Sequence, residues 1–203
     1  MRPVLVTMNV VVDAARHERR DTLDQAWADF LAACDLLPVP VPNRPAAVEL
    51  IELAGAGGVL LTGGNDLAAY GGTAPERDAA EEALVAAALE RRLPVLGVCR
   101  GMQLLLHRFG AGLEPVDGHV STEHTIETDE GPRIVNSFHR WAARESAGPL
   151  RVTARAADGV IEAVAAPELR LTGIMWHPER RAVADARDTA LFHETFAGGQ
   201  CAR

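Results

Sequence analysis

Leu93-Pro-Val-Leu-Gly-Val-Cys-Arg-Gly-Met-Gln103 is the stretch that decides the fold, because it predicts a buried strand over 95–98, a tight turn at Cys99 and a helix from Gly101. Gly97 and Gly101 remove the side chains that would otherwise collide across the turn. Unpaired N–H groups at the start of the helix would stabilise a thiolate there. The segment therefore predicts a nucleophilic cysteine, although an isolated buried cysteine is more often a small core residue.

The first half of the chain alternates between short apolar strands and helical patterns. Strands are predicted over 3–8, 37–41, 58–62 and 95–98, and helices over 22–34, 46–54, 76–92 and 101–109. This order predicts an α/β fold with a doubly wound, mostly parallel central sheet and helices on both of its faces. Such sheets bind ligands at the carboxyl ends of their strands, where both the 62–66 loop and Cys99 are expected.

The second half has shorter apolar runs separated by turn signals. Strands are predicted over 119–127, 133–136, 150–154, 160–165 and 171–175, followed by a closing helix over 182–196. We expect extra antiparallel strands added to the α/β core. No repeat or linker interrupts the sequence, so residues 1–203 are predicted to form a single domain.

The composition limits the classes of function. The chain has 203 residues, of which 48% are hydrophobic and 24% charged, with a net charge of -8. The negative charge argues against nucleic acid and anionic membrane as partners. The residues after Met1 are expected to form the first strand rather than a signal peptide, and no apolar run approaches the length of a membrane helix. The three cysteines suggest neither a disulfide framework nor a zinc site, and they fit a reducing cytoplasm.

A second chemical element is Gly173-Ile-Met-Trp-His-Pro-Glu179, at the end of a predicted strand. A catalytic thiol needs a base, and the pKa of histidine suits it to that task. An imidazole in turn needs an acceptor that fixes its tautomer and orientation. His177 and Glu179 supply both groups, although a surface His-Glu pair is the alternative for this triplet alone.

A third element is the loop Thr62-Gly-Gly-Asn-Asp66. Two adjacent glycines can turn backbone N–H groups toward a substrate carbonyl, as an oxyanion hole requires. The alternative is an ordinary turn at the end of a strand.

Together, the GVCRGMQ, WHPE and LLTGGND segments resemble the class I glutamine amidotransferase-like superfamily, and within it the γ-glutamyl hydrolase branch. The resemblance implies a flavodoxin-like fold and a hydrolase that cleaves a γ-glutamyl amide through a γ-glutamyl thioester, without cofactor or metal. It implies Cys99 as the nucleophile, His177 as the base and acid, and Glu179 as the orienting carboxylate. The N–H groups of Gly64 and Arg100 would stabilise the oxyanion. An arginine after the nucleophile resembles the stand-alone hydrolases of this branch rather than the ammonia-donating glutaminases.

The resemblance also implies a set of substrate-binding residues. Val135-Asn-Ser-Phe-His139 is similar to a VNS-x-H motif that lines the glutamyl pocket, although an edge strand with a polar end is an equal alternative. The implied binding residues are Gly63, Asn65, Gln103, Asn136, Ser137 and His139.

Two stretches near the N-terminus, 18–25 and 37–43, resemble a small subgroup, the γ-glutamyl-CDP-amidate hydrolases of bacterial capsule phosphoramidate synthesis. In that subgroup the products are glutamate and cytidine diphosphoramidate. Arg19 and Arg20 are expected just before the first helix, where they could reach a diphosphate. The alternative is a solvated basic pair, with Asp21 or Thr22 capping the helix.

Other functions stay open at this stage. A hydrolase of γ-glutamyl-γ-aminobutyrate or a similar small amide is one alternative, and a glutaminase subunit that supplies ammonia to a separate synthetase is another. We expect a small-molecule γ-glutamyl substrate, possible homo-oligomers and a cytoplasmic location. No metal is expected, because His119 and His124 lie five residues apart with no third partner in the sequence pattern, and we place them on a strand bordering the pocket.

Overall fold

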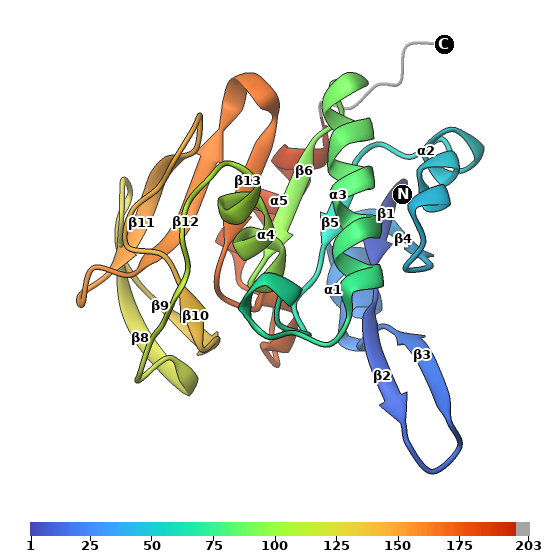
Figure 1. The fold of residues 1–203 in the computed structure, drawn as a ribbon. Helices are drawn as coiled ribbons and strands as arrows, with labels where there is room; N and C mark the ends of the chain where they lie inside the picture. Colours follow the sequence, from blue (N-terminus) through green and yellow to red (C-terminus); the bar gives the residue numbers. More distant parts are fainter. Residues whose placement is uncertain (198–203) are drawn as a thin grey trace.

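A nine-stranded mixed sheet runs through residues 1–197, the part of the chain that the computed structural model describes (Figure 1). Cys201 lies outside the described residues. The sheet order is β4-β1-β5-β6-β13-β12-β11-β8-β9. Its strands are β1 (Arg2–Thr7), β4 (Leu36–Val41), β5 (Val59–Leu61), β6 (Val95–Val98), β8 (Val120–Thr128), β9 (Gly131–Phe138), β11 (Arg151–Ala156), β12 (Ile161–Ala166) and β13 (Leu171–Ile174).

The sheet has a parallel part and an antiparallel part. β4, β1, β5, β6 and β13 are mutually parallel, whereas β12, β11, β8 and β9 each pair antiparallel with their neighbours. The strand predicted over 171–175 therefore belongs to the parallel core and not to the antiparallel extension, which corrects one expectation. Because β13 runs parallel to β6, both strands deliver the residues after them to the same edge of the sheet.

Helices cover both faces of the sheet, as predicted. They are α1 (Ala26–Ala33), α2 (Leu50–Leu53), α3 (Pro75–Glu90), α4 (Arg100–Arg108) and α5 (Ala186–Ala197), with 3-10 helices η1 (Pro45–Glu49), η2 (Ala68–Tyr70), η3 (Pro167–Leu169) and η4 (Pro178–Arg180). Alternate residues of β1 face opposite layers: Leu5 packs with α3 and α4, while Val4 and Val6 pack with α1 and α5. In residues 1–197, no helix combines the length and apolarity needed to cross a membrane.

A polar hairpin, β2 (Asn9–Asp13) and β3 (Glu18–Thr22), extends beyond the sheet next to α1 (Figure 1). The prediction of a helix from residue 22 is wrong here, because α1 begins only at Ala26 and residues 18–22 are a strand. Neither Asp21 nor Thr22 caps this helix. The hairpin escaped prediction because most of its side chains face solvent, so it lacks the apolar alternation that marks a strand. A second small ribbon pairs β7 (Glu114–Pro115) with β10 (Trp141–Ala142).

Candidate active site

Cys99 occupies a sharp turn between β6 and α4. Its φ of 52° and ψ of -106° are rarely adopted by residues other than glycine, and such strain is typical of functional positions. Its N–H donates to the carbonyl of Ile174 over 2.7 Å, which ties the turn to β13. A β-carbon on Gly97 would lie 2.5 Å from the carbonyl carbon of Gly101, so the close approach of strand and helix requires glycine.

His177 lies just beyond β13, at the same edge of the sheet as Cys99. Its Nδ1 lies 2.7 Å from Oε1 of Glu179, and both side chains are buried. The ring of Phe138 packs edge-on against the imidazole, with centroids 5.6 Å apart. The structure therefore brings the predicted base and its orienting carboxylate together, with Nε2 of the imidazole left for the thiol.

The surroundings of His177 favour its charged form. Burial alone lowers the pKa of this imidazole, but the charge and hydrogen bond of Cys99, together with Glu179, raise the pKa to about 9. At neutral pH the imidazole of His177 is then protonated and lies beside the Cys99 sulfur. This pair can attack a carbonyl carbon and has a proton ready for the leaving group.

We expect Glu179→Gln to shift the basic limb of the pH–rate profile. Glu179 raises the pKa of His177, so its neutral replacement lowers that pKa, and the imidazolium is lost at a lower pH. In the wild type, kcat/KM should decline as the pH rises through about 9, and in the variant the decline should begin closer to neutrality. The measurement is kcat/KM against pH, with the exposed Glu168→Gln as matched control. An unchanged limb in Glu179→Gln would contradict the assignment.

The glycine loop after β5 lies directly against His177 and Cys99. A β-carbon on Gly63 would lie 2.6 Å from Cε1 of His177 and 3.5 Å from Cβ of Cys99, so only glycine lets the loop approach this closely. Gly64 has a φ of 124°, in the region that favours glycine. The loop therefore borders the space in front of the thiol, as the sequence predicted for an oxyanion loop.

Arg77 of α3, which no sequence motif indicated, binds the backbone of this loop. Its fully buried guanidinium donates from Nη2 to the carbonyls of Thr62 (2.8 Å) and Gly63 (2.9 Å). Because C=O and N–H point in opposite directions in a trans peptide unit, the Gly64 N–H points away from Arg77. The only signal in the sequence is the i,i+4 spacing to Glu81, which is equally typical of an exposed pair.

Arg100 shares the same buried ion-pair network. Its guanidinium pairs with Glu81 and Asp78 of α3, and only 1% of its side chain is exposed. Burial alone would raise the pKa of Glu81, but Arg100 and Arg77 lower it below its usual value. The Arg100 backbone N–H lies in the first turn of α4, where such groups lack a helical partner. The predicted oxyanion role of this N–H stays a prediction.

Several predicted binding residues form hydrogen bonds with backbone groups of the protein. The Asn136 amide both donates to the His177 carbonyl and accepts from its N–H, each over 2.8 Å. Ser137 Oγ donates to the His119 carbonyl, and Gln103 Nε2 donates to the Trp141 carbonyl. The Asn65 amide bonds the backbone of Val10 in β2 through both of its ends. Their contacts with substrate stay predictions.

The remaining predicted residues contact acidic side chains. Arg19 lies on β3, the strand that precedes α1 in the chain, and its Nε donates to Glu76 Oε1 over 2.9 Å. Arg20 bonds Glu18 over 2.8 Å on the same strand. His139 follows β9, with Nε2 lying 3.4 Å from Glu162 Oε1.

His119 and His124 also reach Glu162, so the expectation that these histidines lack a further partner is wrong. The sequence did not show it because Glu162 lies in a strand that pairs with neither β8 nor β9.

A cleft of about 280 Å³ opens in front of the glycine loop and His177. One wall is formed by the base of the β2–β3 hairpin and the start of α1. No sequence motif indicated that either of these two elements lies at the site. The lining residues are Asn9, Thr22, Leu23, Asp24, Trp27, Thr62, Gly63, Gly64, His177, Glu179 and Arg180.

The sequence profile of the peptidase C26 family matches residues 4–128 and 119–179. The chain belongs to this family. A curated relative in Campylobacter jejuni, named gamma-glutamyl-CDP-amidate hydrolase, is 31% identical over 86% of this chain and 88% of its own. The gamma-glutamyl-gamma-aminobutyrate hydrolase PuuD of Escherichia coli is 28% identical over 84% of each chain.

Solved structures agree with this assignment at the level of the fold. A glutamine amidotransferase from Thermotoga maritima superposes with a TM-score of 0.66 at 16% identity, covering 88% of this chain and 76% of that one. The predicted class I glutamine amidotransferase-like fold is thus confirmed. As a peptidase C26 family member with γ-glutamyl hydrolase relatives, the chain is a hydrolase acting on an amide C–N bond.

Proposed function

We propose that this peptidase C26 family enzyme hydrolyses a γ-glutamyl amide through a γ-glutamyl thioester on Cys99, and that its substrate is γ-glutamyl-CDP-amidate. The observation that carries the reaction type is the strained Cys99 turn, which faces a charged His177 fixed by Glu179. The thiolate fits a reducing compartment, so we place the enzyme in the cytoplasm.

The reaction follows from the positions of these groups. The Cys99 thiolate attacks the γ-carbonyl carbon, and its oxygen becomes an oxyanion facing the N–H groups of Gly64 and Arg100. The C–N bond then breaks as His177 donates its proton to the leaving nitrogen, which yields the thioester. Neutral His177 next takes a proton from water, and the hydroxide displaces the thiolate to give glutamate.

The hairpin wall of the cleft supports the nucleotide-linked substrate. The two N-terminal stretches that resemble the CDP-amidate subgroup are joined here: Nδ2 of buried Asn43 donates to Asp21 Oδ1 over 2.7 Å, and its N–H donates to Oδ2 over 3.0 Å. The next residues after Asp21 line the cleft. The extent of similarity to the Campylobacter jejuni enzyme adds to this proposal.

Arg180 is the cation best placed for a diphosphate. It lines both the active-site cleft and an adjoining hollow of about 540 Å³, and its guanidinium lies 4.4 Å from the ring centroid of Phe138. Arg19 and Arg20 already donate hydrogen bonds to Glu76 and Glu18, so they reach a ligand only after leaving these partners, whereas the acidic contact of Arg180 is longer, 3.7 Å from its Nε to Glu179 Oε1. We assign the diphosphate contact to Arg180, with Arg19 and Arg20 as the alternative.

A substrate comparison tests the proposal. We expect kcat/KM for γ-glutamyl-CDP-amidate to exceed that for glutamine and for γ-glutamyl-γ-aminobutyrate by about 100-fold or more, because only the first carries a diphosphate that an arginine of the cleft can bind. The readout is glutamate release by the purified chain. A preference for γ-glutamyl-γ-aminobutyrate would replace the substrate with that of the Escherichia coli relatives. A preference for glutamine, with stimulation by an added synthetase, would indicate an ammonia-supplying subunit.

Variants within the same assay locate the diphosphate contact. Arg180→Gln should lower kcat/KM for the nucleotide-linked substrate by about 10-fold or more and leave glutamine hydrolysis nearly unchanged. The double variant Arg19→Gln/Arg20→Gln is the matched comparison. A selective loss in the double variant alone would move the contact to the hairpin.

A further inference from the structure

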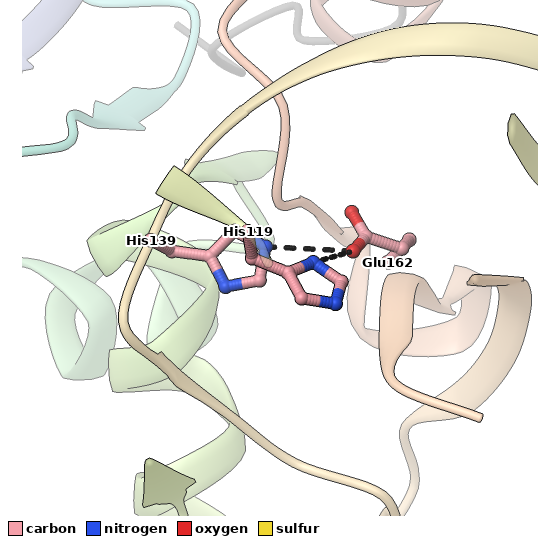
Figure 2. Close-up of side chains that lie close together, drawn as sticks. All are labelled: His119, His139 and Glu162. Atoms are coloured by element: carbon pink, nitrogen blue, oxygen red, sulfur yellow. Dashed lines mark ion pairs between the residues drawn. The ribbon is translucent and has the colours of Figure 1, made fainter. Parts of the chain in front are cut away.

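Three histidines converge on one carboxylate in the antiparallel half of the sheet. Glu162 Oε1 lies 3.3 Å from His119 Nδ1, 3.2 Å from His124 Nε2 and 3.4 Å from His139 Nε2. Figure 2 shows His119 and His139 turned toward the carboxylate. We call these four residues the histidine cluster. It is separate from the Cys99 turn, and nothing in the proposed reaction uses it.

Polar atoms of the histidine cluster are buried without hydrogen-bond partners. Glu162 is fully buried, and His119 and His139 are 4% and 2% exposed. Both oxygens of Glu162, both ring nitrogens of His139, His119 Nδ1 and His124 Nε2 have no hydrogen-bond partner among the described residues. Such groups are costly to bury unless something satisfies them. We therefore expect a further group to bind at the centre of the cluster and satisfy these polar atoms.

The ligand atoms of His119, His139 and Glu162 are spaced closely enough to hold a cation. Ligands at about 2.0–2.1 Å from a tetrahedral Zn²⁺ lie about 3.3 Å from one another, close to the distances observed around Glu162 Oε1. One ligand atom each from His119, His139 and Glu162 lies within 4.8 Å of the others. We propose that the histidine cluster binds a divalent cation, Zn²⁺ by its ligand chemistry, through His119, His139 and Glu162.

The outer nitrogen of His119 gives independent support. Its Nε2 lies 3.2 Å from Asp158 Oδ2, so the carboxylate favours the tautomer that carries its proton on Nε2 and leaves Nδ1 free to bind. Histidines that bind metals very often donate their second N–H to a carboxylate in this way.

A cation here would link strands that carry the active site. His119 and His139 flank the β8–β9 hairpin, and β9 also holds Asn136, which bonds the backbone of His177. Glu162 lies on β12, where its carbonyl accepts from the N–H of Met175. Because His119, His139 and Glu162 are buried and the cluster is separate from the Cys99 turn, we expect a structural role for the ion. Its expected effect is on the stability of this half of the sheet.

Zinc titration of metal-free protein tests the proposal. Because Cys99 and His177 can themselves hold Zn²⁺, the titrations use the Cys99→Ala chain, stripped with a chelator. We expect one Zn²⁺ per chain by calorimetry, a rise in Tm on adding ZnCl₂, and a tetrahedral visible spectrum when Co²⁺ replaces Zn²⁺. His139→Ala and Glu162→Gln, added singly, should each weaken Zn²⁺ binding by about 100-fold or more. The exposed His193→Ala is the matched control and should bind as the parent does.

Each result of the Zn²⁺ titration either supports or overturns the proposal. The proposal is overturned if the Cys99→Ala chain binds no Zn²⁺, or if its affinity is the same in His139→Ala and Glu162→Gln as in His193→Ala, since the ion would then lie elsewhere. Circular dichroism of each metal-free variant establishes that it is folded, and Glu162→Gln retains the shape of the side chain if His139→Ala does not fold. None of these readouts depends on hydrolysis, so a wrong substrate would leave the test intact.

Discussion

Cys99→Ala is expected to lower hydrolysis of the preferred γ-glutamyl amide by about 10⁴-fold or more, because it removes the atom that bonds to the substrate. The substitution keeps the β-carbon at the strained turn, and Cys99 is only 7% exposed, so the contacts of the turn with Gly63 and Ile174 should survive. The fold should therefore be retained while the chemistry is lost. Activity above about 1% of wild type would contradict the nucleophile assignment.

Cys34→Ala is the matched control for this experiment. Burial, with a smaller effect from Asp188, raises the pKa of the Cys34 thiol to about 11, so this cysteine should be unreactive at neutral pH. Mass spectrometry of protein quenched during turnover should show a γ-glutamyl adduct in the wild type and in Cys34→Ala, and none in Cys99→Ala. An adduct on Cys99→Ala would place the acyl group on another residue.

The parts of the fold that could be predicted are those that local sequence determines. The conformation around Cys99 is determined by adjacent residues, namely the apolar strand before it and the glycine on each side of the turn. The β2–β3 hairpin could not be predicted in this way, since its exposed side chains lack a periodic pattern. The direction of β13 could not be predicted from the sequence either, because strand pairing is a long-range property that short apolar runs do not encode.

The same distinction applies to the site. His177 and Glu179 are two residues apart, so their pairing could be proposed from the sequence and is found in the structure. Arg77 reaches the glycine loop from a different element, and Glu162 joins histidines that lie at least 23 residues away along the chain. Contacts between residues so far apart along the chain can be identified only in the three-dimensional structure. The contact of His177 with Glu179 could thus be predicted from the sequence, whereas the contacts of Arg77 and Glu162 could not.

His177→Ala should reduce kcat by about 10³-fold or more, since one imidazole both pairs with the thiolate and protonates the leaving nitrogen. Its raised pKa of about 9 means that the wild-type ring carries this proton at neutral pH. In the variant, Cys99 loses its neighbouring positive charge. Alkylation of Cys99 by iodoacetamide, followed by mass spectrometry against pH, should then require a higher pH than in the wild type.

The alkylation profile distinguishes loss of the ion pair from damage to the fold. A misfolded variant would expose Cys34 as well, so labelling of Cys99 without labelling of Cys34 shows that the core around α1 and α5 is intact. His193→Ala, an exposed substitution on α5, should keep both the wild-type profile and wild-type kcat. If His177→Ala retained about 10% of kcat or the wild-type labelling profile, another group would have to supply the proton. Glu179, which lies 2.7 Å from Nδ1 of the ring, would then be the first residue to examine as the direct acid.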